Sequence, residues 1–387
     1  MTEKKYKEIC DYLRDVTEAS QWEGNVFTVG GCCRDSIMGR EINDIDLAVT
    51  VADGGVKFAE WLYEKGLTYG EPVYFRRFST SRLILREFPE YEIEVVQTRR
   101  EQYTNSNSRN PEVAFGTLEE DCFRRDLTIN SLYQDITTGE IIDFTGKGVD
   151  DIKNHVIRTP LEPNETFEDD PLRILRTVRF AVRYGWEIPE NILKAMARHA
   201  DRIKIIRKER RAAEFEKILT GPNPDKAMTL LRKIGALHTL LPEMMHTFKK
   251  KIHIGENIKL PTVWDFTMEN LKKSKPDIAH RYAALFSEMY RITIPYNDIT
   301  EGEKKERRSN RRGRGRSAIV TTALRRLHYD REFIRKVKAC LPHLKEEKRP
   351  EKAESKINNK ESKTNNKGSK TNNKKKRHGR KAKETSD

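Results

Sequence analysis

The sequence predicts an α+β protein: a small mixed sheet with helices in the first part of the chain, helices alone in the middle, and an unfolded basic tail. Up to about residue 145, short runs rich in β-branched residues alternate with amphipathic stretches, which is the pattern of strands and helices that share one core. From Asp170 onward, apolar residues recur at helical spacing. Residues 346–387 repeat Ser, Lys and Asn without an apolar period, and such a composition cannot bury enough surface to fold.

Local patterns place the individual elements. In the first part we expect helices at 5–16 and 57–65 and strands at 26–29, 44–51, 75–78, 82–86 and 92–98. In the remainder we expect helices at 171–184, 189–199, 207–219, 224–236, 263–273 and 277–291. Asp170-Pro171 starts the first of these, because Asp caps a helix and Pro fits its first turn. The expected domains are a head (1–145), a helical neck (146–240), a helical body (241–345) and a disordered Lys-rich tail (346–387).

The composition bounds the class of protein. Charged residues make up 35% of the 387 residues, and no apolar run approaches the roughly 20 residues of a membrane span. The first residues carry both charge signs and show no apolar core of a signal peptide and no Arg/Ser-rich transit segment. The five cysteines form neither a CxxC pair nor a metal-ligand spacing, so we expect reduced thiols in the cytoplasm. The composition does not specify an oligomeric state.

Positive charge is concentrated near the C-terminus. The chain carries +15 overall. Residues 301–316 hold eight Lys or Arg against three acidic residues, and residues 346–387 hold fifteen against seven. Such stretches are natural partners of polyanions such as RNA, with a strong salt dependence. A solubilising surface without a partner is the alternative interpretation.

The segment FTVGGCCRDSIMGREINDIDLAVT carries the first candidate site. Gly30-Gly31 follows a strand and precedes a helix, so backbone N–H groups there can approach a phosphate. Asp44 and Asp46 lie two residues apart on a predicted strand and therefore share a face. Neighbouring carboxylates repel unless a cation joins them, and Mg²⁺ with a triphosphate is the usual reason for this arrangement. An ordinary tight turn and a solvated strand edge are the alternatives.

The segment GTLEEDCFRRDLTINSL carries the second candidate site. Arg124 and Arg125 can clamp a phosphate. Asp126 can accept a hydrogen bond from a ribose 2′-hydroxyl, which would favour ribonucleotides, and Asn130 belongs to the same segment. A surface salt bridge is the alternative interpretation.

The segment TFEDDPLRILRTVRF carries a possible base-reading site. Asp170 and Arg173 lie about one turn apart on one helix face, and Arg176 and Arg179 extend the stripe. Cytosine and adenine both present an amino donor beside a ring-nitrogen acceptor, which suits a carboxylate beside a guanidinium. Uracil and guanine present the reverse order and leave both charges unsatisfied, at a cost of about 1–3 kcal/mol per group. A helix cap with a solvated arginine face is the alternative.

These three segments resemble one known family. GG-x-x-RD followed by D-x-D, then RRDLTIN and DDPLR are similar to the motifs of class II CCA-adding tRNA nucleotidyltransferases and bacterial poly(A) polymerases. The resemblance covers roughly residues 20–240 and implies a polymerase-beta-like nucleotidyltransferase head. It implies that Asp44 and Asp46 are metal ligands and catalytic. Glu94, on the predicted strand EIEVV, could supply a third carboxylate that faces the same metals, and an exposed charge on the strand is the alternative. It also places Arg34 among the nucleotide-binding residues.

Three further segments bear on this resemblance. Residues 100–117 are polar and predict a loop, and in the family a flexible loop at this place takes part in switching nucleotide specificity. Asp169 is the first acid of DDPLR, where the family's EDxxR motif usually has Glu. The segment with Glu209, Arg210 and Glu214 matches a family segment that stabilises the neck, so we interpret it as structural.

The region beyond residue 240 resembles the HD phosphohydrolase domain that is fused to some bacterial members. Its metal ligands are missing, because Phe266 stands where a His is expected and Ser-Glu replaces His-Asp at 287–288. We therefore expect helical packing there and no hydrolysis.

The resemblance implies an enzyme that extends RNA without a nucleic-acid template. The expected reaction adds CCA to the 3′ end of tRNA from CTP and ATP, with Mg²⁺ as cofactor, release of pyrophosphate and the tRNA acceptor stem as partner. A poly(A) polymerase, or an enzyme that adds only A or only CC, is the alternative activity. An RNA-binding protein without catalysis is a third interpretation, which the intact Asp44, Asp46, Arg125 and Asp170 disfavour.

Overall fold

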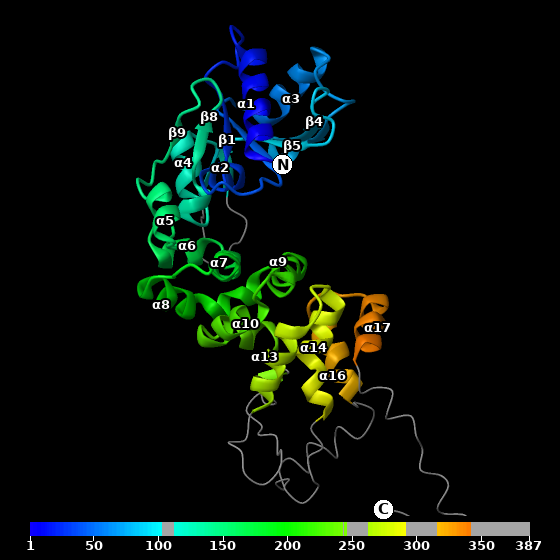
Figure 1. The fold of residues 1–387 in the computed structure, drawn as a ribbon. Helices are drawn as coiled ribbons and strands as arrows, with labels where there is room; N and C mark the ends of the chain where they lie inside the picture. The colour runs from blue at the N-terminus through cyan, green and yellow to red at the C-terminus, as the bar shows by residue number, and fades with distance from the viewer. Residues whose placement is uncertain (103–111, 243, 246–261, 292–315, 342–387) are drawn as a thin grey trace, which may run out of the picture. The chain divides into compact units, whose positions relative to one another are not determined.

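The computed structural model describes residues 1–102, 112–242, 244–245, 262–291 and 316–341 (Figure 1). These residues belong to one compact unit, Met1–Pro342. The predicted tail and nearly all of the basic segment 301–316 lie outside the described residues. The fold class is α+β, as the sequence predicts, with a mixed sheet in the first part of the chain and helices in the rest.

A seven-stranded sheet forms the first part. Its strands lie in the order β3-β4-β5-β2-β1-β8-β9, and all neighbours are antiparallel except β2 and β5, which are parallel. The strands are β1 (Val26–Val29), β2 (Ile45–Val49), β3 (Val73–Phe75), β4 (Thr80–Ile84), β5 (Glu92–Gln97), β8 (Tyr133–Asp135) and β9 (Ile141–Ile142). Because β2 and β5 are inner strands, hydrogen bonds on both sides fix the residues that they carry.

The two faces of this sheet bury different helices. The helices are α1 (Glu3–Thr17), α2 (Gly31–Ile37), α3 (Gly54–Glu64) and α4 (Leu118–Phe123) (Figure 1). α1 packs on the face that carries Thr28, since Tyr6 Oη lies 2.7 Å from Thr28 Oγ1. The other face buries a cluster from β1, β2, β8 and α4, which consists of Phe27, Val29, Ala48, Tyr133 and Cys122. Alternation along β2 places Asp46 on this second face, two residues before Ala48.

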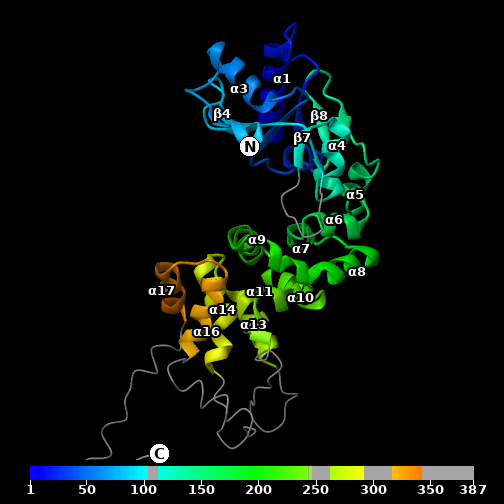
Figure 2. The ribbon, with the colours of Figure 1, turned by 180° about the vertical axis from the view of Figure 1, so that it is seen from behind.

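The prediction of a loop at 100–117 was wrong at both ends. β6 (Arg99–Gln102) pairs with β7 (Glu112–Phe115) in an antiparallel hairpin (Figure 2), and the residues between them lie outside the described chain. Val113 is 52% exposed and Phe115 is 43% exposed. The hairpin is therefore held by its backbone hydrogen bonds more than by burial of side chains. A hydrophobic pattern in the sequence indicates burial, so it could not predict these two strands.

The strand expected at 75–78 was also partly wrong. β3 ends at Phe75, and Arg76–Phe78 forms a 3₁₀ turn. Ser79 follows with a φ of 44°, which reverses the chain into β4. A run of aromatic and arginine residues does not distinguish a strand from such a turn, because none of the three turn residues is buried.

Helices make up the rest of the described chain, as expected. They are α5 (Gly148–Asn154), α6 (Pro163–Asp169), α7 (Leu172–Tyr184), α8 (Glu190–His199), α9 (Lys208–Thr220), α10 (Pro224–Lys233), α11 (Ala236–Leu240), α13 (Val263–Lys273), α14 (Ile278–Arg291), α16 (Arg316–Arg326) and α17 (Arg331–Cys340). The single helix expected at 224–236 is two helices, since Gly235 adopts a φ of 80° between them. α7 packs against α6, α9 and α10. Every helix of the described chain is too short or too polar to span a bilayer.

Candidate active site

Three carboxylates meet at one edge of the central strands. Asp46 of β2 lies beside Glu94 of β5 in the parallel register. Asp44 is the residue before β2, which begins at Ile45, one residue later than predicted. Asp44 is exposed, whereas Asp46 and Glu94 are half-buried. The fold thus brings together the three acidic residues that the sequence singled out from two separate segments.

These surroundings raise the pKa of the Asp46 carboxyl. Burial raises the pKa of the Asp46 carboxyl to about 6, the charges of Glu94 and Asp44 push it the same way, and Arg125 and Arg82 oppose them. Glu94 Oε2 lies 3.5 Å from Arg82 Nε. A half-buried carboxylate among other carboxylates is stabilised in its charged form by a bound cation.

The donor set suits Mg²⁺ with phosphate oxygens better than a metal held by protein alone. Within the part of the chain that the structure describes, no three His, Cys, Asp or Glu side chains are arranged to hold a metal by themselves. Mg²⁺ commonly takes one or two carboxylates and completes its shell with water and substrate phosphates. Asp44 and Asp46 fit this role, because both supply hard oxygen ligands and the charge of Asp44 is close enough to raise the pKa of Asp46.

The predicted glycine turn follows β1. Gly30 has a φ of 76° and a ψ of −114°, a conformation that favours glycine, and a Cβ there would lie 3.4 Å from Arg125 Nη1. The Gly30 N–H donates to Leu132 O at 2.9 Å, so this amide differs from the expectation that it faces a phosphate. In this structure the glycine at position 30 instead leaves room for the Arg125 guanidinium to approach the backbone of the turn.

The arginine pair, Arg124 and Arg125, is anchored by a carboxylate that was not predicted from the sequence. Asp121 of α4 is fully buried; its Oδ1 accepts from Arg124 Nε at 2.9 Å, and its Oδ2 accepts from Arg125 Nη2 at 2.8 Å. Tyr133 Oη donates to the same Oδ2 at 2.6 Å. Burial alone would raise the pKa of Asp121, but the Arg125 and Arg124 charges outweigh it and hold that pKa well below its usual range. The spacing of three and four residues to the two arginines was the available signal.

A chain of hydrogen bonds joins the three predicted sites. Arg34 Nη1 donates to Asn130 Oδ1 at 2.5 Å, and Asn130 Nδ2 donates to Asp126 Oδ1 at 3.1 Å. Arg176 Nε of α7 donates to Asp126 Oδ2 at 2.7 Å. Burial would raise the pKa of Asp126, yet Arg176 and Asn130 more than offset it and lower the pKa. Asp126 is therefore charged, and it ties the first part of the chain to α7.

The base-reading pair is engaged with protein groups. Asp170 Oδ1 accepts from the Leu172 N–H at 3.0 Å, so Asp170 caps the start of α7, and its Oδ2 accepts from Arg210 Nη2 at 2.9 Å. Arg173 is only 6% exposed. It donates from Nη1 to Thr166 O at 3.1 Å and from Nη2 to Arg124 O. Arg173 thus links α7 to the arginine pair.

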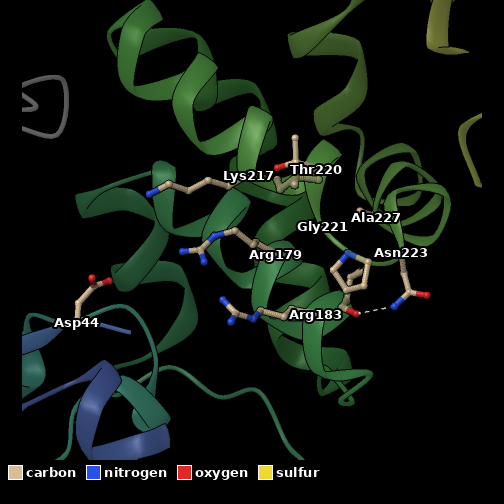
Figure 3. A pocket seen from close by; sticks show the side chains of 11 residues that line it. Asp44, Arg179, Arg183, Lys217, Thr220, Gly221, Asn223 and Ala227 are labelled. Carbon is tan, nitrogen blue, oxygen red and sulfur yellow. Dashed lines mark hydrogen bonds between the residues drawn. The ribbon is translucent and has the colours of Figure 1, made fainter. Parts of the chain in front are cut away.

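A basic wall faces Asp44 across a pocket of about 490 Å³. Figure 3 shows the side chains of Arg179, Arg183 and Lys217 extending from their helices toward the side where Asp44 lies. Arg179 Nε also donates to Glu214 Oε1 at 2.5 Å. Arg179 was predicted from the sequence, whereas Arg183 and Lys217 were not, because an exposed basic residue on a helix gives no signal of the partner that it faces. A carboxylate opposite three basic side chains suits a ligand that carries both phosphate and metal.

Comparison with known proteins places this site in a family. Residues 26–158 match the poly A polymerase head domain, and residues 185–247 match a region described as a probable RNA and SrmB-binding site of polymerase A. Together they cover about half of the chain. The chain belongs to the tRNA nucleotidyltransferase and poly(A) polymerase family. The prediction of this family from its motifs is confirmed.

Proteins named as tRNA nucleotidyltransferases or CCA-adding enzymes match about 60–70% of the chain. The mitochondrial CCA tRNA nucleotidyltransferase of Saccharomyces cerevisiae is 35% identical over 255 residues, which cover 59% of this chain and 46% of the relative. The tRNA nucleotidyltransferase cca1 of Schizosaccharomyces pombe is 32% identical, over 67% of this chain and 54% of the relative. The CCA-adding enzyme of Bacillus subtilis is 32% identical, over 66% and 60%. The chain spans about half the length of the first two relatives.

Solved structures of the same family share the fold. A CCA-adding enzyme in apo form II matches with a TM-score of 0.60 and 23% identity, over 92% of this chain and 87% of the other. The Thermotoga maritima CCA-adding enzyme, solved in complex with tRNA, matches with a TM-score of 0.57 and 23% identity, over 88% and 83%. At these identities the likeness shows that the nucleotidyltransferase family fold extends over most of the chain.

Proposed function

We propose that this chain is a nucleotidyltransferase that adds CCA to the 3′ end of tRNA from CTP and ATP. The observation that carries the proposal is that Asp44, whose charge acts on Asp46 beside Glu94, faces the basic residues of α7 and α9 across one pocket. In each step the terminal 3′-oxygen of the RNA forms a bond to the α-phosphorus of the nucleotide, and pyrophosphate leaves. The names of the relatives, which are tRNA nucleotidyltransferases and CCA-adding enzymes, support this assignment.

In this proposal the acidic residues bind the metal and the basic residues bind phosphate. Asp44 and Asp46 would hold Mg²⁺, which when bound lowers the pKa of the attacking hydroxyl and neutralises triphosphate charge. Glu94 keeps this edge acidic. Arg125, fixed by Asp121 beside the Gly30 turn, can donate to phosphate oxygens. The basic wall offers charge for the triphosphate or for the RNA end.

Nucleotide choice would come from Asp170 and Arg173. The Asp170–Arg210 ion pair has one half-exposed partner, and such pairs contribute only about 0–1 kcal/mol, so a base can displace it at low cost. Arg173 is held more firmly, by two carbonyl oxygens in a buried place. Its planar guanidinium therefore keeps a fixed orientation against which the ring nitrogen of cytosine or adenine can be tested.

Arg173→Lys is expected to lower kcat/KM for CTP and ATP by about 100-fold and to raise the relative incorporation of UTP and GTP. A lysine cannot bond both carbonyls and present a planar donor pair at once, so α7 and the arginine pair shift relative to each other. Each nucleotide is measured separately, with thermal unfolding as the check on folding. Equal loss with all four nucleotides and no misincorporation would count against base reading by this residue.

The proposed reaction is tested by supplying single nucleotides. A tRNA transcript that ends before CCA is incubated with the full chain and Mg²⁺, and we expect two additions with CTP alone and three with CTP and ATP together. Omitting Mg²⁺ by chelation should stop incorporation. A long tail made from ATP alone would instead identify a poly(A) polymerase, an alternative that the matched head-domain description keeps open. A single A, or CC without A, would identify a partial activity.

The organisation and the location of the enzyme belong to the same proposal. We assign residues 1–145 to the catalytic head, 146–240 to the neck and 241–345 to the body, with 346–387 as a basic tail. All five cysteines are free in the structure, which suits the cytoplasm or another reducing compartment; the S. cerevisiae relative is named as mitochondrial.

A further inference from the structure

A second basic depression lies at the start of α9. It has a volume of about 760 Å³ and is lined by residues 204–209 and 211. Four of these residues are basic, namely Lys204, Arg207, Lys208 and Arg211, and one is acidic, Glu209. Arg207 and Lys208 are exposed, so the depression is open to a large partner.

The first turn of α9 presents free backbone donors to this depression. α9 has 13 residues, and the residue before it, Arg207, provides no side-chain cap. The first intrahelical bond runs from the Arg211 N–H to Arg207 O, at 3.1 Å. The N–H groups of the three residues before Arg211 therefore lack a helical acceptor, and the Glu209 carboxylate accepts the N–H of its own residue. Such an end attracts anions.

A buried arginine points to the same ligand independently of the helix end. Arg211 is only 5% exposed, and its Nε is buried without a hydrogen-bond partner. Its Nη1 makes a long contact of 3.5 Å to Ile203 O. Burial lowers the pKa of Arg211, and among the described residues no carboxylate is near enough to oppose it. Burial and the charge of Arg211 lower the pKa of Arg326 of α16. Arg326 is therefore a second positive charge close to Arg211.

We propose that this depression binds a backbone phosphate of the RNA acceptor. This proposal rests on the proposed function, because it takes RNA as the substrate. A phosphate oxygen can accept from the guanidinium of Arg211, which lines the depression, and another from the N–H groups at the start of α9, with Arg207 and Lys208 as flanking charges. The depression lies within the residues that match the RNA-binding region. None of its lining residues belongs to the catalytic site, and Arg210, which lies between lining residues Glu209 and Arg211, pairs with Asp170.

The acidic side chain of Glu209 leads to a prediction opposite in direction to that for the basic residues. Its side chain is 58% exposed, and Oε1 lies 3.4 Å from His328 Nε2. With the carboxylate at the helix end, Glu209 occupies the place of the anion until RNA arrives. Removing this negative charge should therefore strengthen RNA binding, whereas removing the positive charges should weaken it.

The test measures binding of the full chain to a tRNA transcript that lacks CCA, without nucleotides, at several salt concentrations. We expect Arg211→Gln to weaken binding about tenfold and Arg207→Gln with Lys208→Gln to reduce the salt slope by one to two units. Glu209→Gln should tighten binding. The matched control combines Lys194→Gln with Lys226→Gln, both exposed elsewhere on the helices, and should leave binding within about twofold.

Because Arg211 is buried, the exposed double variant keeps the test valid if Arg211→Gln folds poorly. Unchanged affinity and salt slope in the double variant, or a loss as large in the matched control, would overturn the phosphate site. Inorganic phosphate is titrated as a second probe: binding that depends on Arg211 while tRNA affinity does not would mean a free-anion site and would also overturn it. These readings need no nucleotide transfer, so a failure of the proposed reaction is seen separately, in the incorporation assay.

Discussion

Replacing Asp46 with Asn should abolish nucleotide transfer and at the same time make the folded protein more stable. Transfer should fall at least 10³-fold, because an amide cannot supply the charged oxygen that a metal needs beside Asp44. Stability should rise because Asp46 is half-buried next to Glu94. The folded structure therefore keeps a charged carboxylate where burial and its neighbours disfavour it.

The direction of the pH dependence follows from the raised pKa. Burial and the neighbouring acids raise the folded-state pKa of Asp46 from 3.8 to about 6. A raised pKa favours folding while the group is protonated, and that contribution is lost as the pH rises from about 4 through 6. Above pH 6 the ionised carboxylate costs about 1–3 kcal/mol, so Asp46→Asn should gain about that much at pH 7 and almost nothing at pH 4.

Urea unfolding at both pH values, together with the incorporation assay, measures these effects. Glu92→Gln is the matched control, because Glu92 lies on the same strand and face as Glu94 and is exposed; its transfer rate should stay within about twofold. Mg²⁺ should raise the melting temperature of the wild type more than that of the Asn variant. A variant that keeps its transfer rate, or that loses stability at pH 7, would contradict the assigned role of Asp46.

The sequence predicted several of the longer helices because their burial is one-sided and periodic. The helix expected at 171–184 is observed at Leu172–Tyr184. The hairpin of β6 and β7 escaped prediction because its exposed Val113 and Phe115 leave no alternation of buried and exposed side chains. Which segments pair through their backbones depends on the folded chain, and residue type predicts it only weakly.

The candidate site could be predicted in its parts but not in its connections. Asp44 and Asp46 stand out because two carboxylates lie on one strand. Their pairing with Glu94 depends on the parallel register of β2 and β5, which are separated in sequence by α3, β3 and β4. No local pattern specifies such a long-range register.

Asp121 shows the limit of sequence reasoning in another way. It is one of three consecutive acids in LEEDCF, and Glu119 and Glu120 are exposed. Acids in the first turn of a helix are common because they suit its dipole and its cap. Only burial separates Asp121 from them, since its side chain alone turns inward to Arg124, Arg125 and Tyr133.

Asp121→Asn is therefore expected to destabilise the protein by about 3–5 kcal/mol, because it leaves two arginines near a buried site without their carboxylate. The folded-state pKa of Asp121 is lowered from 3.8. Its contribution is therefore present above pH 4 and is lost as the pH falls below that value. The difference between wild type and variant in the free energy of unfolding should thus shrink on acidification.

The same substitution should also lower transfer, since Asp121 fixes the Arg125 guanidinium beside Gly30. We expect kcat/KM to fall about 100-fold, by loss of position alone, in protein that is still folded at low temperature. Glu119→Gln removes a charge from the same helix at an exposed place and should change neither stability nor rate. If Asp121→Asn lost stability but kept its full rate when folded, the carboxylate would serve the core of the head and not the placement of Arg125. A loss of both, with Glu119→Gln unaffected, would tie the buried carboxylate to the geometry of phosphate binding.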